Sequence, residues 1–144
     1  MTAPAVTTER GSVLMLVPAG ILVLLLLAAI AVDAAIVLSA ERELAHRTAA
    51  VAGDLATLAV DDERLYGSGG VELRDDVAAA QTALAFPTDR PPPGFATWSA
   101  SARTDGRRVT VTARAEVRYL FAPAIPGVRR TTTVAASSTA EAAG

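Results

Sequence analysis

The chain has 144 residues, of which 51% are hydrophobic but only 4% aromatic, so we expect one small domain built mainly from Ala, Val and Leu. Its mean hydropathy is positive, which is unusual for a soluble domain and indicates a membrane segment. The net charge of −2 gives no argument for nucleic-acid binding, and the lack of cysteine excludes disulfides, thiolate catalysis and Cys-ligated zinc.

The first predicted element is a transmembrane helix over residues 13–32, a run of 20 residues without a charge. At ~1.5 Å rise per residue, a helix of this length matches the roughly 30 Å hydrocarbon core of a bilayer. Pro18 lies near the start of the run, where a missing N–H costs least. We predict a cytoplasmic tail over 1–12, with Arg10 and Gly11 at the inner membrane boundary and Asp33 at the outer one.

The alternative interpretation of this run is a secretory signal sequence cleaved after Ala31, because residues 29–31 form an A-x-A site. The run is longer than the usual signal core of about 7–15 residues, and helix-compatible sequence continues beyond it, so we favour the anchor. Since the tail is short and the bulk of the chain is C-terminal, we expect a single-pass cell-membrane protein with a cytoplasmic N-terminus and an extracytoplasmic C-terminal domain.

A long amphipathic helix is predicted over residues 33–61, which contain no proline and one glycine. An apolar stripe follows its length: Val37, Leu44, Val51, Leu55 and Leu58. We interpret the stripe as covering the protein's own core; the alternative is that part of it packs against sister helices in an assembly.

A second, short helix is predicted over residues 71–85, after a Gly/Ser turn at 67–70. Val71, Leu73, Val77, Ala80 and Leu84 form its apolar face. Pro87 and the proline run at 91–93 end it, because proline cannot continue a helix.

Three strands follow, at about 96–103, 107–120 and 128–138, and Asp105-Gly106 indicates a type I′ hairpin turn between the first two. If Thr104 pairs with Arg107, Ala102 faces Val109 on the apolar side of the hairpin. The expected fold is therefore α+β, with a head over 62–144 in which helices cover the apolar face of a small antiparallel sheet.

The other side of this hairpin is rich in arginine and threonine. Arg103, Arg108, Arg114 and Arg118 all fall on it and make a possible partner-binding basic face. A merely solvated surface explains the same pattern. Nucleic-acid binding is not expected, because the face lacks interleaved aromatic residues.

No catalytic constellation is present in the sequence. The single histidine, His46, excludes a multi-histidine metal site, and neither a nucleophile elbow nor a phosphate-binding glycine loop is found. We therefore expect a protein that is not an enzyme and that binds no cofactor or metal.

The order Arg10-Gly11, apolar span, Val32-Asp33 and Ala-rich amphipathic helix resembles the TadE/TadG-like proteins of Flp/Tad (tight-adherence) pilus assembly. The C-terminal segment 107–140, with a Val/Thr strand, a Pro/Gly loop and a final strand, is similar to the usual ending of that family. The resemblance implies a membrane-anchored accessory protein that contacts pilin-like subunits or other parts of the apparatus, and that could form oligomers.

One position departs from the family pattern. Pseudopilin members carry a glutamate five residues after the processing glycine, and counting from Gly11 this place is held by Leu16. The chain is therefore more similar to the unprocessed, TadG-like branch, with a permanent anchor. The second hypothesis is a secreted binding module, released after Ala31, that binds an anionic ligand or surface through the arginine face.

Overall fold

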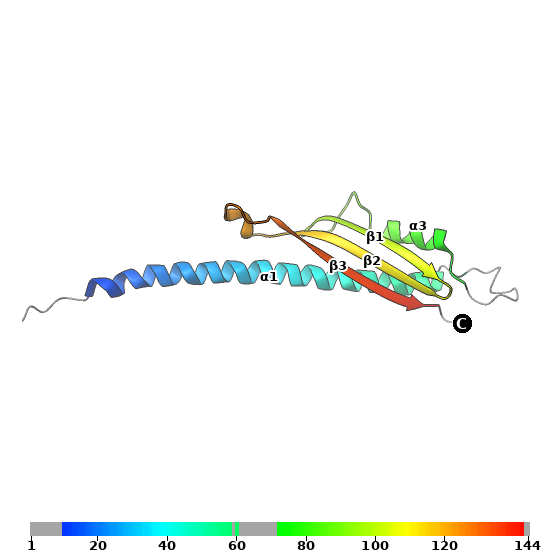
Figure 1. Cartoon of the computed structure of the whole chain (residues 1–144), viewed down its shortest axis with the longest axis horizontal. Helices are drawn as coiled ribbons and strands as arrows, with labels where there is room; N and C mark the ends of the chain where they lie inside the picture. Colours follow the sequence, from blue (N-terminus) through cyan, green and yellow to red (C-terminus); the bar gives the residue numbers. More distant parts are fainter. Residues whose placement is uncertain (1–9, 59, 61–71, 143–144) are drawn as a thin grey trace, which may run out of the picture.

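The computed structural model describes residues 10–58, 60 and 72–142, with side chains from Leu16 onward (Figure 1). A long helix, α1 (Arg10–Leu58), is followed by a short helix, α3 (Asp75–Ala85), and three strands: β1 (Phe95–Asp105), β2 (Arg108–Arg118) and β3 (Thr131–Glu141). A 3-10 turn, η1 (Ala122–Ala124), lies between β2 and β3. The architecture is α+β, and the predicted order of elements is confirmed.

The helix α1 is 49 residues long and continuous through Pro18 and Asp33. The sheet and α3 pack along its C-terminal part, whereas its N-terminal part extends alone (Figure 1). The large apolar side chains from Leu16 to Val32 are 41–67% exposed, because they precede the part of α1 on which the sheet packs. By length and composition this is one helix that could span a membrane.

The short helix begins later than predicted, at Asp75 rather than at residue 71. Leu73 is extended instead: it forms an isolated antiparallel bridge with Val60, and its N–H donates to the Gly106 carbonyl at 3.1 Å. Val71 lies outside the described residues. The predicted apolar face of this helix is also partly wrong, because Ala78 and Thr82 are buried while Leu84 is 73% exposed.

The sheet is antiparallel with the strand order β1-β2-β3, so β2 is its centre. All three strands have 11 residues, and they are displaced by a few residues from the predicted ranges. Inward and outward residues alternate along β2, with Val109, Val111, Ala113, Ala115 and Val117 buried. The division of the hairpin into an apolar and a polar side is therefore as predicted.

The register of the hairpin differs from the prediction by two residues. Asp105 pairs with Arg108, so the two central residues of the turn are Gly106 and Arg107, and Ala102 faces Val111 rather than Val109. Of these two central residues, only Gly106 has a positive φ, +58°. A type I′ turn needs positive φ at both central residues, whereas type II′ needs it only at the first, which is here glycine.

Two adjoining core clusters lie between α1 and the sheet. The first joins Leu55 and Ala52 of α1 with Ala78 of α3 and with Val109 and Val111 of β2. The second joins Leu44 of α1 with residues of all three strands and with Phe86. At its centre is the single tryptophan, Trp98, whose Nε1–H donates to the Pro87 carbonyl at 2.6 Å. Both helices therefore cover one face of the sheet, and no described residue outside the strands covers the other face, which is called the open face below.

Candidate functional site

The three predicted membrane-boundary residues lie at two levels of α1. Arg10 and Gly11 lie in the first turn of the helix. Asp33 lies 23 residues further along, at the level where the connection between β2 and β3 approaches the helix. That connection, residues 119–130, is called the β2–β3 loop below.

The carboxylate of Asp33 accepts hydrogen bonds from three consecutive backbone N–H groups of this loop. Leu120 donates to Oδ1 at 2.7 Å, Phe121 to both oxygens at 3.0 and 3.3 Å, and Ala122 to Oδ2 at 2.8 Å. Ala122 is the first residue of the turn η1 and the other two donors precede it, so the carboxylate binds the N–H groups at the entry to this turn from a residue 87 to 89 positions away.

The Asp33 side chain is buried, with 8% of the residue exposed. This burial raises the pKa of the carboxyl, but the N–H groups of Phe121, Leu120 and Ala122 lower it, and the net pKa lies below its ordinary value of 3.8. Asp33 is therefore ionised at neutral pH and holds the loop as a charged acceptor.

The β2–β3 loop satisfies most of its own backbone donors. Besides the three bonds to Asp33, Tyr119 N–H donates to Arg130, Ala124 to Phe121, Ile125 to Ala122 and Val128 to Ile125. Pro123 and Pro126 have no N–H to satisfy. Of residues 119–128, only Gly127 has an N–H without such a bond.

Although its backbone donors are mostly bonded, the loop has exposed apolar side chains. Leu120, Phe121, Ile125 and Val128 are 63%, 43%, 49% and 44% exposed. Phe121, Ile125 and Val128 line an open apolar groove of about 910 Å³ between the loop and α1, whose helix wall runs from Leu26 to Leu38. Phe121 also borders a second hollow of about 370 Å³ on the helix between Leu22 and Val32.

The predicted contact stripe is mostly internal. Leu44 and Leu55 are fully buried, and Val37 and Val51 pack partly against the core clusters. Leu58 lies apart from them and is 62% exposed. The buried face of α1 follows a slightly rotated line: Asp33, Ala40, Leu44, Thr48, Ala52, Leu55 and Ala56.

The four arginines of the predicted basic face, Arg103, Arg108, Arg114 and Arg118, are all exposed on the open face of the sheet. Arg103 and Arg114 border a shallow polar groove of about 480 Å³ together with Ser99, Thr110 and Thr112. Cross-strand pairs of hydroxyls, Thr110 with Thr139 and Thr112 with Ser137, cover the same face.

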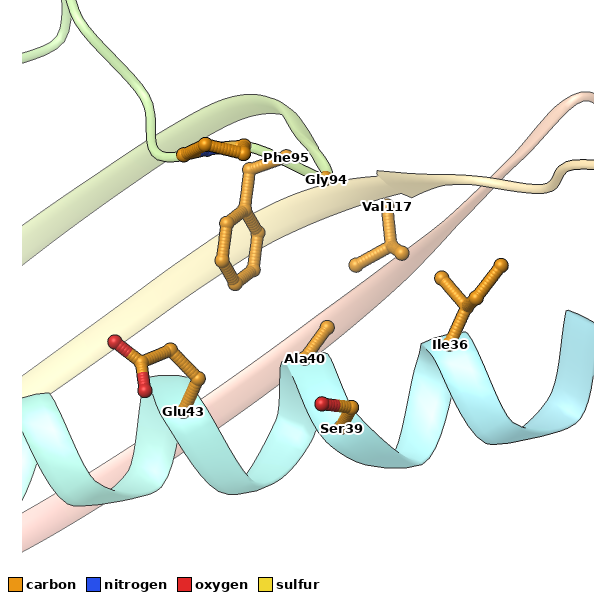
Figure 2. Close-up of a pocket in the computed structure, with 8 residues that line it drawn as sticks. Ile36, Ser39, Ala40, Glu43, Gly94, Phe95 and Val117 are labelled. Atoms are coloured by element: carbon orange, nitrogen blue, oxygen red, sulfur yellow. The ribbon is translucent and has the colours of Figure 1, made fainter.

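A further groove of about 290 Å³ separates α1 from the beginning of β1 (Figure 2). Ile36 and Ala40 face Phe95 and Val117 across it, and Glu43 stands at its edge. Glu43 forms an ion pair with Arg47 at 2.5 Å, and the Arg47 guanidinium lies 5.4 Å from the centre of the Trp98 ring. These contacts belong to the helix–sheet packing and form no reactive arrangement.

Among the described residues, no group of three or more His, Cys, Asp or Glu side chains is placed to hold a metal ion. Comparisons with protein-family models, with curated proteins and with solved structures found no match. The arrangement that stands out is therefore the contact between Asp33 and the β2–β3 loop.

Sequence reasoning placed Asp33 at a membrane boundary but did not find the loop that binds it. Nothing in the spacing of Asp33 and Leu120 indicates contact, because they are 87 positions apart. The available signal was chemical: a lone acid inside a long apolar helix needs hydrogen-bond donors, and "YLFAPAIPG" supplies three free N–H groups before a proline.

Proposed function

We propose that this protein is a membrane-anchored, non-catalytic accessory protein of a Flp/Tad-type pilus assembly or secretion apparatus. Residues 13–32 anchor it in the cell membrane with the N-terminus in the cytoplasm, and α1 carries the α+β head on the extracytoplasmic side. The head acts as a scaffold or contact surface for pilin-like subunits or other parts of the apparatus.

The observation that carries the proposal is the difference between the two parts of α1. Its N-terminal part is apolar and uncovered, while the same unbroken helix becomes the central core element of the head from Asp33 onward. A soluble protein would not leave such a long apolar surface exposed. The family resemblance of residues 9–60 and 107–140 supports the particular apparatus.

The anchor is tested by the intact mass and the extraction behaviour of the native protein. We expect the mass to retain residues 13–32 and the protein to remain in membranes washed with alkaline carbonate. A mature N-terminus at Val32 would instead establish the secreted binding module, with the exposed arginine face as its binding surface.

The role in the apparatus is tested by deleting the gene in its source organism and measuring surface pili and co-purifying partners. We expect pilus assembly to fail in the deletion strain and to be restored by the full chain. The Leu84→Ala variant, changed on the exposed side of α3, serves as the control and is expected to restore assembly equally well. Normal pili in the deletion strain would contradict the proposal.

A further inference from the structure

We propose that the β2–β3 loop lies in the membrane interface, so that the protein contacts the bilayer at a second place beside its helix. This proposal rests on the proposed anchor and extends it. Its occupant is the lipid of the leaflet on the side of the head.

The first argument is position. The groove beneath the loop has the loop as one wall and α1 from Leu26 to Leu38 as the other. Phe121 also borders the hollow that includes Leu25, which precedes Asp33 by eight residues, or ~12 Å along a helix axis. If residues 13–32 lie in a bilayer, the loop reaches beside the last turns of that span, as its place over α1 also shows (Figure 1).

The second argument is the hydrogen bonding of the loop backbone. Irregular backbone is excluded from an apolar medium when its polar groups are unsatisfied. In residues 119–128 every N–H except that of Gly127 is bonded, three of them to Asp33, and two residues are prolines without an N–H. The part of the loop that carries the apolar side chains therefore meets, on its donor side and apart from Gly127, the condition for contact with lipid.

The third argument is the distribution of side chains. Leu120, Phe121, Ile125 and Val128 are 43–63% exposed, and the last three line the open groove between the loop and α1. Three exposed arginines flank them, Arg118, Arg129 and Arg130, and no acidic residue occurs between residues 117 and 140. Apolar residues bordered by arginines suit the boundary between acyl chains and anionic headgroups.

The experiment uses the full chain in phospholipid vesicles and exploits its lack of cysteine. Single-cysteine variants Ile125→Cys and Val128→Cys in the loop, Leu24→Cys in the span and Leu84→Cys on α3 are labelled with an environment-sensitive fluorophore. Each is measured with lipids brominated near the headgroup, with lipids brominated deep in the acyl chain, and with an aqueous quencher. Trp98 fluorescence verifies that each variant is folded, and the two loop positions support each other if one fails to fold.

The expected result is that shallow brominated lipids quench the probes at 125 and 128 at least about twofold more strongly than the probe at 84, since interfacial apolar surfaces lie roughly 5–10 Å into the boundary. The probe at 24, in the middle of the proposed span, is quenched by the deeply brominated lipids. Leu84 is the control because it is also apolar and exposed, at 73% against 49% for Ile125 and 44% for Val128, but lies on α3, away from the loop (Figure 1).

Two results would overturn the loop proposal while leaving the anchor intact. The loop probes could resemble the probe at 84, which would place the loop in water. They could also be shielded from both quenchers while the probe at 24 is lipid-quenched, which would show that protein, such as a second copy of the chain, covers the groove. A probe at 24 that lipid does not quench would refute the anchor and the loop contact together.

Discussion

Asp33 is the single polar side chain in the stretch of α1 from Val13 to Leu38. Its charge is compatible with burial because three N–H groups of the β2–β3 loop converge on it. The same bonds fix the conformation of a loop that has no other hydrogen bonds to the helix among the described residues. One carboxylate thus orders both the helix face and the turn η1.

The lowered pKa of Asp33 predicts how the stability of the head depends on pH. A carboxyl whose pKa is lower in the folded state stabilises that state above its unfolded value, near 3.8, and this contribution is lost as the pH falls through the folded pKa. We expect Asp33→Asn to lower the urea midpoint at pH 7, and the difference from wild type to shrink progressively below about pH 4. Trp98 fluorescence measures both midpoints, and a difference that is the same at pH 7 and at about pH 2.5 would contradict the assignment.

Gly106 in the hairpin turn and Gly53 in α1 are both exposed, and together they test the backbone conformation of the turn. A Cβ at Gly53 or at Gly106 would meet no atom within 4 Å, but only Gly106 has a positive φ, +58°. We expect Gly106→Ala to destabilise the head by about 1–2 kcal/mol, and Gly53→Ala in the helix to stabilise it by about 0.5–1 kcal/mol. Urea denaturation measures both; changes of the same sign would show that φ at Gly106 is not the controlling factor.

At the scale of elements, the sequence predicted periodic features well. The alternation along β2 and the apolar stripe of α1 are both repeated patterns; burial follows the alternation of β2 closely, and on α1 it follows a line slightly rotated from the stripe. The hairpin register was wrong by two residues because a shift of two preserves every inward and outward position. Only the turn geometry distinguishes the two registers, and it depends on which residue takes positive φ.

The remaining errors arose where long-range contacts decide. Leu73 fits a helical pattern, but its N–H bonds to Gly106 and its backbone pairs with Val60, so it is extended. Leu58 continues the stripe of α1 but is exposed and does not pack against the first core cluster, although Ala56 and Val60 on either side of it do. Neither outcome is encoded in the neighbouring sequence, and the same holds for the contact of Asp33 with the β2–β3 loop.

The stripe on α1 predicts a contrast between two leucines of the same helix. Leu44 is fully buried in the cluster around Trp98, whereas Leu58 is 62% exposed. We expect Leu44→Ala to lower the free energy of unfolding by about 2–5 kcal/mol, and Leu58→Ala to change it by less than about 0.5 kcal/mol. If instead Leu58→Ala impairs assembly without changing stability, the end of the stripe contacts a partner, as the second interpretation of the stripe requires.

At the scale of the whole molecule, the two core clusters share α1 and β2, and Val51 packs against both. Such continuity favours one cooperative unfolding unit for the head. The single tryptophan lies in only one of the clusters, so it can report whether the other is coupled to it.

We therefore expect Leu55→Ala, in the cluster without Trp98, to lower the urea midpoint of Trp98 fluorescence as Leu44→Ala does. The transition measured by circular dichroism at the sheet minimum is expected to coincide with it. Leu84→Ala serves as the exposed control. A Trp98 transition that does not respond to Leu55→Ala would show that the head unfolds in two parts.

The bonds of Asp33 also have a mechanical consequence. If α1 crosses a bilayer as proposed, sliding it inward by one turn, ~5.4 Å, would carry both the carboxylate and the loop attached to it into hydrocarbon. Sliding it outward would expose the apolar residues that precede Asp33 to water. The contact between Asp33 and the loop then fixes the depth of the helix in the bilayer at a single value and resists a pull or push along the helix axis.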